Sequence, residues 1–148
     1  MSNRTRQVHI EGLPELRQMS ERIAPRTANR LARATVHWIA GQVRNAMRQR
    51  SPKDDGILRR AINSVRRRGT PTEAVSDVRV SHGAGVKHDA WYWHFIEFGT
   101  VKQPAQPYIQ PTIDEMTPKI PAMYREHFGK RLERELEKEA RKLGVNRR

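Results

Sequence analysis

The sequence contains no cysteine, which excludes disulfide bonds and thiolate metal ligands. It also has no apolar run that approaches the roughly 18 residues of a membrane-spanning helix. The first nine residues are polar and basic, without the apolar core of a signal peptide. We therefore expect a protein that is made and used in the cytoplasm and has no membrane partner.

Acidic side chains are scarce relative to basic ones, with 16 Asp and Glu against 29 Lys and Arg and a net charge of +13. The excess lies in residues 1–70, which carry 16 basic and 5 acidic side chains, whereas residues 71–148 carry 13 and 11. A positive field of this kind attracts polyanions, and arginine matches the geometry of phosphate well. We expect nucleic acid nearby, without sequence-specific base contacts. The alternative is that the charge only maintains solubility.

Recognisable catalytic motifs are also lacking: there is no P-loop, dinucleotide fingerprint or nucleophile elbow. His94 and Glu97 have helical spacing, but a metal site needs further ligands fixed nearby, and the sequence suggests none. Asp89 and Glu97 are better explained by packing than as a catalytic pair. A Ser-His-Asp triad, whose members meet only in three dimensions, leaves no sequence signature to test. We expect a protein that is not an enzyme and has no cofactor or metal.

The apolar spacing predicts two long helices. Val8 and Ile10 alternate with polar residues as in a short strand, and helical spacing follows until Pro25, which should kink or break the segment. A stripe from Leu31 to Met47 then predicts a helix of about six turns, which ends at Ser51-Pro52. We expect Trp38, at the edge of this stripe, to anchor the helix on a sheet.

The middle of the chain predicts a small sheet. A short helix from Ile57 leads into a hairpin over 66–81, and a proline-rich extended loop covers 101–111. Ile109, Ile113 and Met116 begin a C-terminal helical pattern, within which Thr117-Pro118 resembles an N-cap followed by proline at the first helical position. The expected fold class is α+β, with a long N-terminal helix and a C-terminal helix packed on a small, mainly antiparallel β-sheet. The expected organisation is a disordered basic arm (1–7), a single domain (8–144) and a basic tail (145–148).

The most distinctive local feature of the sequence is the segment Glu97-Phe98-Gly99-Thr100, in which a charged residue stands among hydrophobic residues just before a glycine. A carboxylate among Phe95, Ile96 and Phe98 is expensive to bury unless it accepts hydrogen bonds. One hypothesis is that Glu97 accepts from backbone N–H groups of the loop that starts at Gly99, with Gly99 at positive φ and Thr100 adding a hydroxyl bond. The alternative is a solvent-facing glutamate beside an ordinary turn. The following loop, 103–108, is either a partner-docking arm or a rigid linker.

Residues 90–100, followed by 106–111, resemble the gene-product-ten-like family of lambdoid phages, the tail-completion or head–tail joining proteins. The shared pattern is an aromatic segment ending in Glu-Phe-Gly-Thr, a short gap, and Pro-aromatic-hydrophobic-x-Pro. The residues that carry it here are Glu97, Phe98, Gly99, Thr100, Pro107 and Pro111. The resemblance extends over roughly residues 8–143.

The resemblance implies a structural subunit of a six-fold ring in the virion neck, assembled in the host cytoplasm, that completes the tail and joins it to the DNA-filled head. Its implied partners are copies of itself, head-closure or connector proteins, and tail-terminator or tail-tube proteins. Phage DNA would pass through the basic lumen without sequence specificity. The arginines expected to face that lumen are Arg59, Arg60, Arg66, Arg67 and Arg68. The alternatives are a tail-terminator ring protein and a free-standing, non-specific nucleic-acid-binding protein.

Overall fold

The computed structural model describes residues 23–54, 56–70 and 73–144 of the chain. Its elements, in order, are α2 (Pro25–Arg50), α3 (Ile57–Ala61), β1 (Ile62–Arg66), β2 (Ser76–Val80), α4 (Trp93–Phe98), α5 (Ile109–Met116), the 3₁₀ turn η1 (Thr117–Lys119) and α6 (Ile120–Lys142). Long helices near both ends and a two-stranded antiparallel sheet between them confirm the predicted α+β class.

Several predictions concern residues outside the described part of the chain. These are the basic arm 1–7, the strand at Val8 and Ile10, the helical segment up to residue 22, and the tail 145–148. The structure therefore does not test them.

Helix α2 is bounded as the sequence predicts. Pro25 occupies its first turn, where the missing N–H has no intrahelical acceptor in any case. At the other end Ser51 turns to extended backbone, with φ −65° and ψ 146°, because Pro52 disfavours helical geometry in the residue before it. Ser51 still donates its N–H to the Met47 carbonyl at 2.9 Å, so the last turn closes cleanly.

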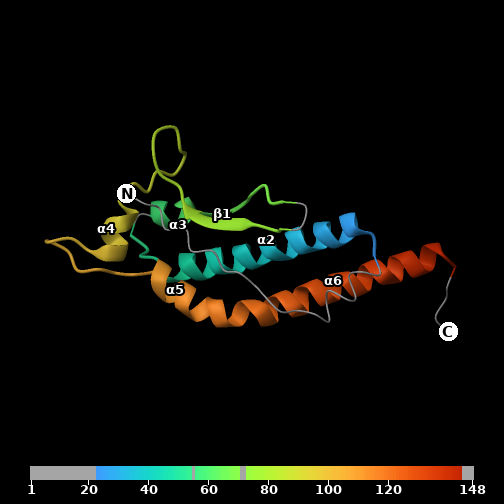
Figure 1. The fold of residues 1–148 in the computed structure, drawn as a ribbon. Helices are drawn as coiled ribbons and strands as arrows, with labels where there is room; N and C mark the ends of the chain where they lie inside the picture. Colours follow the sequence, from blue (N-terminus) through green and yellow to red (C-terminus); the bar gives the residue numbers. More distant parts are fainter. Residues whose placement is uncertain (1–22, 55, 71–72, 145–148) are drawn as a thin grey trace.

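The two strands pair antiparallel, from Ile62 opposite Val80 to Arg66 opposite Ser76. Figure 1 shows α2 running along the long axis of the molecule, with the strands on one side of it and α6 on the other. The sheet packs on α2, and α6 packs on α2 rather than forming a second cover of the sheet. Helix α2 is therefore the central layer, which contacts the sheet on one side and α6 on the other.

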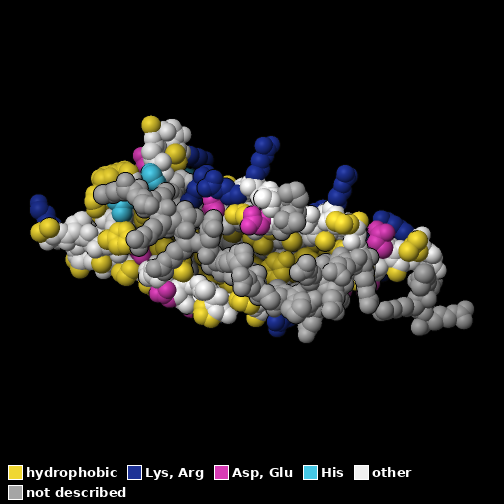
Figure 2. Space-filling model, in the orientation of Figure 1, with side chains coloured by type: hydrophobic (Ala, Val, Ile, Leu, Met, Phe, Trp, Pro, Cys, Tyr) yellow, Lys and Arg dark blue, Asp and Glu magenta, His cyan; other side chains and the backbone are white. Residues whose placement is uncertain are grey.

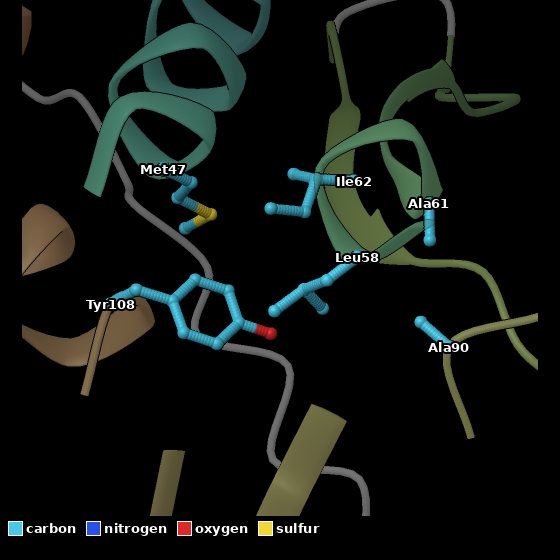
Figure 3. Close-up of a cluster of buried hydrophobic side chains, with 6 residues drawn as sticks. All are labelled: Met47, Leu58, Ala61, Ile62, Ala90 and Tyr108. Atoms are coloured by element: carbon cyan, nitrogen blue, oxygen red, sulfur yellow. The ribbon is translucent and has the colours of Figure 1, made fainter. Parts of the chain in front are cut away.

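Two separate apolar clusters lie along α2. The larger one joins α2, α3, β1 and the segments around α4 and α5, and Figure 3 shows its buried side chains converging. Its buried members are Met47, Leu58, Ala61, Ile62, Ala90 and Tyr108. The smaller one joins α2 to α6 through Ile23, Leu31, Phe128 and Leu132. The larger cluster holds the ends of α4 and α5 against the rest of the fold.

The prediction that Trp38 anchors α2 on the sheet is wrong. Its ring stacks on His127 of α6, with ring centroids 4.2 Å apart and an interplanar angle of 9°. Its position at the edge of the stripe correctly indicated a contact, but periodicity along one helix does not say which element lies opposite. His127 also hydrogen-bonds the buried Thr35 hydroxyl at 3.2 Å, so this polar edge fixes the α2–α6 pairing.

The helical pattern predicted from Ile109 onward is confirmed, but the interpretation of Thr117 as an N-cap is wrong. Helix α5 begins at Ile109, within the stretch expected to be an extended loop, and continues through η1 into α6. Thr117 does not act as an N-cap, since its hydroxyl donates back to the Ile113 carbonyl at 2.7 Å. The N-terminus of α5 is instead stabilised from a distant part of the chain, which a local reading of sequence does not anticipate.

Candidate functional site

Glu97, on α4, is 5% exposed and accepts three backbone hydrogen bonds from the start of α5. Oε2 accepts from the N–H groups of Tyr108 and Ile109 at 2.8 and 2.9 Å, and Oε1 accepts from that of Gln110 at 2.9 Å. Of the two arrangements that the sequence left open, the structure therefore has the buried, hydrogen-bonded carboxylate. The donors lie at the far end of the loop from Gly99, in the first turn of α5.

This geometry satisfies both partners. The first N–H groups of a helix have no intrahelical acceptor, and the positive end of the helix dipole favours a negative charge. Glu97 supplies that charge, and three donors compensate for its loss of water. The same charge, after the larger effect of burial, raises the pKa of the Tyr108 hydroxyl. One side chain thus fixes α4 against α5.

Gly99 begins a projecting arm, residues 99–107. Its φ is +76°, and a Cβ at this position would lie 2.7 Å from the backbone nitrogen of Ala105. Thr100 and Gln103 exchange backbone hydrogen bonds across the arm at 2.8 and 3.3 Å. The Thr100 hydroxyl accepts from the backbone of Lys102 and Gln103, within the arm rather than at Glu97. The arm is a tight, hydrogen-bonded turn that only glycine can enter at this position.

Helix α4 has an inner and an outer aromatic face. On the inner face Tyr92, Trp93 and Ile96 pack on the larger core cluster. The outer face consists of Trp91, 59% exposed, Phe95, 44%, and Phe98, 75%. Phe95 and Phe98 share this face because residues three apart lie on the same side of a helix.

This outer aromatic face continues into the arm, whose Val101 is fully exposed. Figure 2 shows hydrophobic side chains at this end of the molecule, beside α4 and at the arm tip. Pro107, in the arm, is exposed, whereas Pro111 lies in the first turns of α5. Proline is tolerated there because its missing N–H would have had no intrahelical acceptor. The motif residues therefore build one unit, in which a buried carboxylate holds an arm beside an exposed aromatic face.

The five arginines expected at a DNA passage do not form one group. Arg59 and Arg60 belong to α3, whereas Arg66 ends β1 and is followed by Arg67 and Arg68. They thus occupy the two ends of β1. Arg67 is neutralised by an ion pair with Asp77, and the Arg59 Nε donates to the Arg48 carbonyl at 3.0 Å. The structure does not test whether any of them meets DNA.

Two arginines that the sequence argument did not select, Arg44 and Arg48, lie on α2 alongside β1. Arg44 Nη1 donates to the Ser64 hydroxyl at 3.1 Å, and Arg48 Nε donates to the Ile62 carbonyl at 2.9 Å. Both therefore lie against β1. Their spacing of four residues, off the apolar stripe, was visible in the sequence, but the strand beside them was not.

Residues 15–99 match the family model described as "Bacteriophage HK97-gp10, putative tail-component". The chain belongs to the HK97-gp10-like family. No curated protein and no solved structure gives a significant match. The family assignment means that this chain is a bacteriophage tail component, part of the virion, with a structural role.

The matched region of this HK97-gp10-like protein includes Glu97, Phe98 and Gly99 and ends before the rest of the arm. It thus contains α2, the sheet and α4 but not α5 or α6. Within the part of the chain that the structure describes, no group of three or more His, Asp or Glu side chains is placed to hold a metal ion. No helix in the described ranges is long and apolar enough to cross a membrane.

Proposed function

We propose that this tail component is a subunit of the ring that completes the tail and joins it to the DNA-filled head. The observation that carries the proposal is the exposed aromatic face of Trp91, Phe95 and Phe98 beside the arm that Glu97 holds in place. Contiguous exposed aromatic surface is typical of protein–protein contacts. In a tail component, the available partners are further copies of the chain and the proteins above and below it.

In this proposal the ring is six-fold and sits at the head-proximal end of the tail. Its neighbours are a head-closure or connector protein on one side and a tail-terminator or tail-tube protein on the other. The net charge of +13 supports a lumen that passes DNA without reading its sequence. A rigid arm suits such an interface because little conformational entropy is lost when it docks.

The test is electron microscopy of phage that carry Phe98→Asp, with Leu143→Asp as the control. Both side chains are large, apolar and exposed, at 75% and 77%, but Leu143 lies at the far end of α6. We expect filled heads and unattached tails from Phe98→Asp and intact virions from the control. Intact virions from Phe98→Asp, or a normal phage yield from Glu97→Ala, would contradict the proposal.

Two alternatives give different results in related experiments. A tail-terminator ring stops polymerisation of the tail, so its loss should give tails of abnormal length. A free-standing nucleic-acid-binding protein, which the net charge alone favours, should bind DNA tightly as a monomer. Light scattering combined with a salt titration of DNA binding distinguishes this last alternative from a ring subunit.

A further inference from the structure

A group of three arginines lies where α2, α3 and β1 meet. We refer to Arg44, Arg48 and Arg59 as the arginine cluster. Arg59 binds the backbone of Arg48, and Arg44 and Arg48 are one helical turn apart. None of the ion pairs found within the described ranges involves any of the three, and each is partly buried.

The protein holds these guanidinium groups in place through neutral acceptors. Arg48 Nε binds the Ile62 carbonyl, Arg59 Nε binds the Arg48 carbonyl, and Arg44 Nη1 binds the Ser64 hydroxyl. None of these acceptors neutralises charge. Arg48 Nη1 and both terminal nitrogens of Arg59 make no hydrogen bond within the described residues, so fixed donors are left for an external ligand.

The positive side chains of this region act on one another, and the ion pair of Arg67 with Asp77 lies at the far end of β1. Partial burial, followed by the charges of Arg44 and Arg59, lowers the pKa of Arg48. On α2, beside the Ser76 that pairs with Arg66, burial and then the charges of Arg66 and Arg44 lower the pKa of His37. Figure 2 shows Lys and Arg side chains gathered over the region of α3 and β1. Like charges held this close are unfavourable in the free protein and become favourable when an anion binds between them.

We propose that the arginine cluster, extended by Arg66, is a seat for the phosphodiester backbone of a nucleic acid. Arg59 and Arg48 lie at the Ile62 end of β1 and Arg66 at its other end, roughly 13 Å away at the rise of a strand. A free phosphate ion cannot span that length, whereas one strand of a duplex presents more than one phosphate over it. The choice of ligand rests on the proposed function, in which DNA passes the protein.

The seat is chemically suited to phosphate and not to bases. Guanidinium groups bind phosphate oxygens through paired N–H donors, and such contacts carry no sequence information. The neutral groups beside them, such as Asn45 and Asn63, already accept hydrogen bonds from Arg44 and Arg48. The seat therefore predicts binding that depends steeply on salt and little on sequence.

The first test measures the affinity of the full-length protein for a labelled DNA duplex over a series of KCl concentrations. The variant is Arg44→Gln/Arg59→Gln. The control is Arg125→Gln/Arg134→Gln, which removes the same charge from exposed positions on α6. We expect the slope of log affinity against log salt to decrease in magnitude by about 2 in the variant, at roughly 0.9 per phosphate contact, and to stay unchanged in the control. Equal losses in the two variants, or none in either, would overturn the seat.

The second test needs no variant and therefore does not depend on a substituted protein folding. Arginines of the wild-type protein are modified with phenylglyoxal and located by mass spectrometry, with and without the duplex. We expect DNA to protect Arg44, Arg48 and Arg59 but not Arg125. If inorganic phosphate at the same phosphate concentration protects these arginines equally well, the cluster binds a single phosphate ion and the proposed nucleic-acid seat is wrong. Protection by phosphatidylserine vesicles but not by DNA would indicate a membrane surface instead.

Failure of the seat and failure of the ring proposal are distinguishable. If the arginine-cluster variant and its control show the same slope of log DNA affinity against log salt, but phage carrying Phe98→Asp still produce unattached tails, the seat is wrong and the proposed ring function is retained. If the slopes separate but Phe98→Asp phage are normal, the protein has a phosphodiester seat without the proposed joining role.

Discussion

The carboxylate of Glu97 and the backbone nitrogen of Tyr108 lie 2.8 Å apart, across 11 residues of chain. Phe98 and the arm lie between them in the chain, so this contact closes the arm at its base. Tyr108 itself is fully buried in the larger core cluster. The position of an exposed surface thus depends on a buried polar contact and on an aromatic ring anchored in the core.

Replacing Glu97 with Ala should lower the free energy of unfolding by about 2–5 kcal/mol, because three buried N–H groups lose a charged acceptor. Urea denaturation measures this change. The control is Glu133→Ala, an exposed position on α6 that should change stability by about 0.5 kcal/mol or less. Equal stabilities of the two variants would show that the Glu97 contacts do not support the fold.

Gly99→Ala should destabilise the protein by more than about 1 kcal/mol, since the position has φ +76° and a Cβ would lie 2.7 Å from the Ala105 nitrogen. Gly129→Ala is the matched control. It lies within α6 with nothing within 4 Å of its added Cβ, so it should stabilise the protein by about 0.5–1 kcal/mol. Thermal melts of the two variants should move in opposite directions. A melting temperature of Gly99→Ala equal to or above that of the wild-type protein would show that this turn does not require glycine.

Phe128→Ala should cost about 3–5 kcal/mol, because Phe128 is 3% exposed and packs between α2 and α6. Phe98→Ala should cost far less, because that ring is 75% exposed. Chemical denaturation of both variants checks the contrast. A large loss from Phe98→Ala would mean that the outer aromatic face is part of the core of the free protein and not a surface for partners.

The protein should become less stable as the pH falls from about 7.5 to 5.5. Burial, followed by the charges of Arg131 and Lys130, lowers the pKa of His127 in the folded state. In the unfolded chain His127 has the ordinary histidine pKa of about 6.5, so the unfolded state binds this proton more readily than the folded state. The free energy of unfolding therefore decreases as the pH falls through about 6.5 towards the lower pKa of the folded state. His127→Gln should show a shallower pH dependence, measured as unfolding free energy at each pH. His37, also lowered, should leave a residual dependence in that variant.

The sequence determined the local elements, because their causes are local. Pro25 and Ser51-Pro52 bound α2, and apolar spacing of three and four residues predicted its buried stripe. The hairpin followed from β-branched alternation at Val78 and Val80. Glu97 was identified because a charge between aromatic residues requires hydrogen-bond donors, and Gly99 because a sharp turn favours positive φ. The absence of cysteine and the surplus of arginine were readable without any structure.

Tertiary packing decided the rest, since it depends on which faces meet. The donors for Glu97 come from the first turn of α5, because that helix is capped by a side chain 12 residues upstream, which helical spacing from Ile109 onward does not reveal. Trp38 stacks on α6 rather than on the sheet, since helical periodicity marks a face but not its partner. Arg44 and Arg48 became neighbours of Arg59 only when β1 packed beside α2. The net positive charge follows from the amino-acid composition alone. The grouping of arginines at one place on the surface does not, because it requires the core to bring segments distant in sequence together.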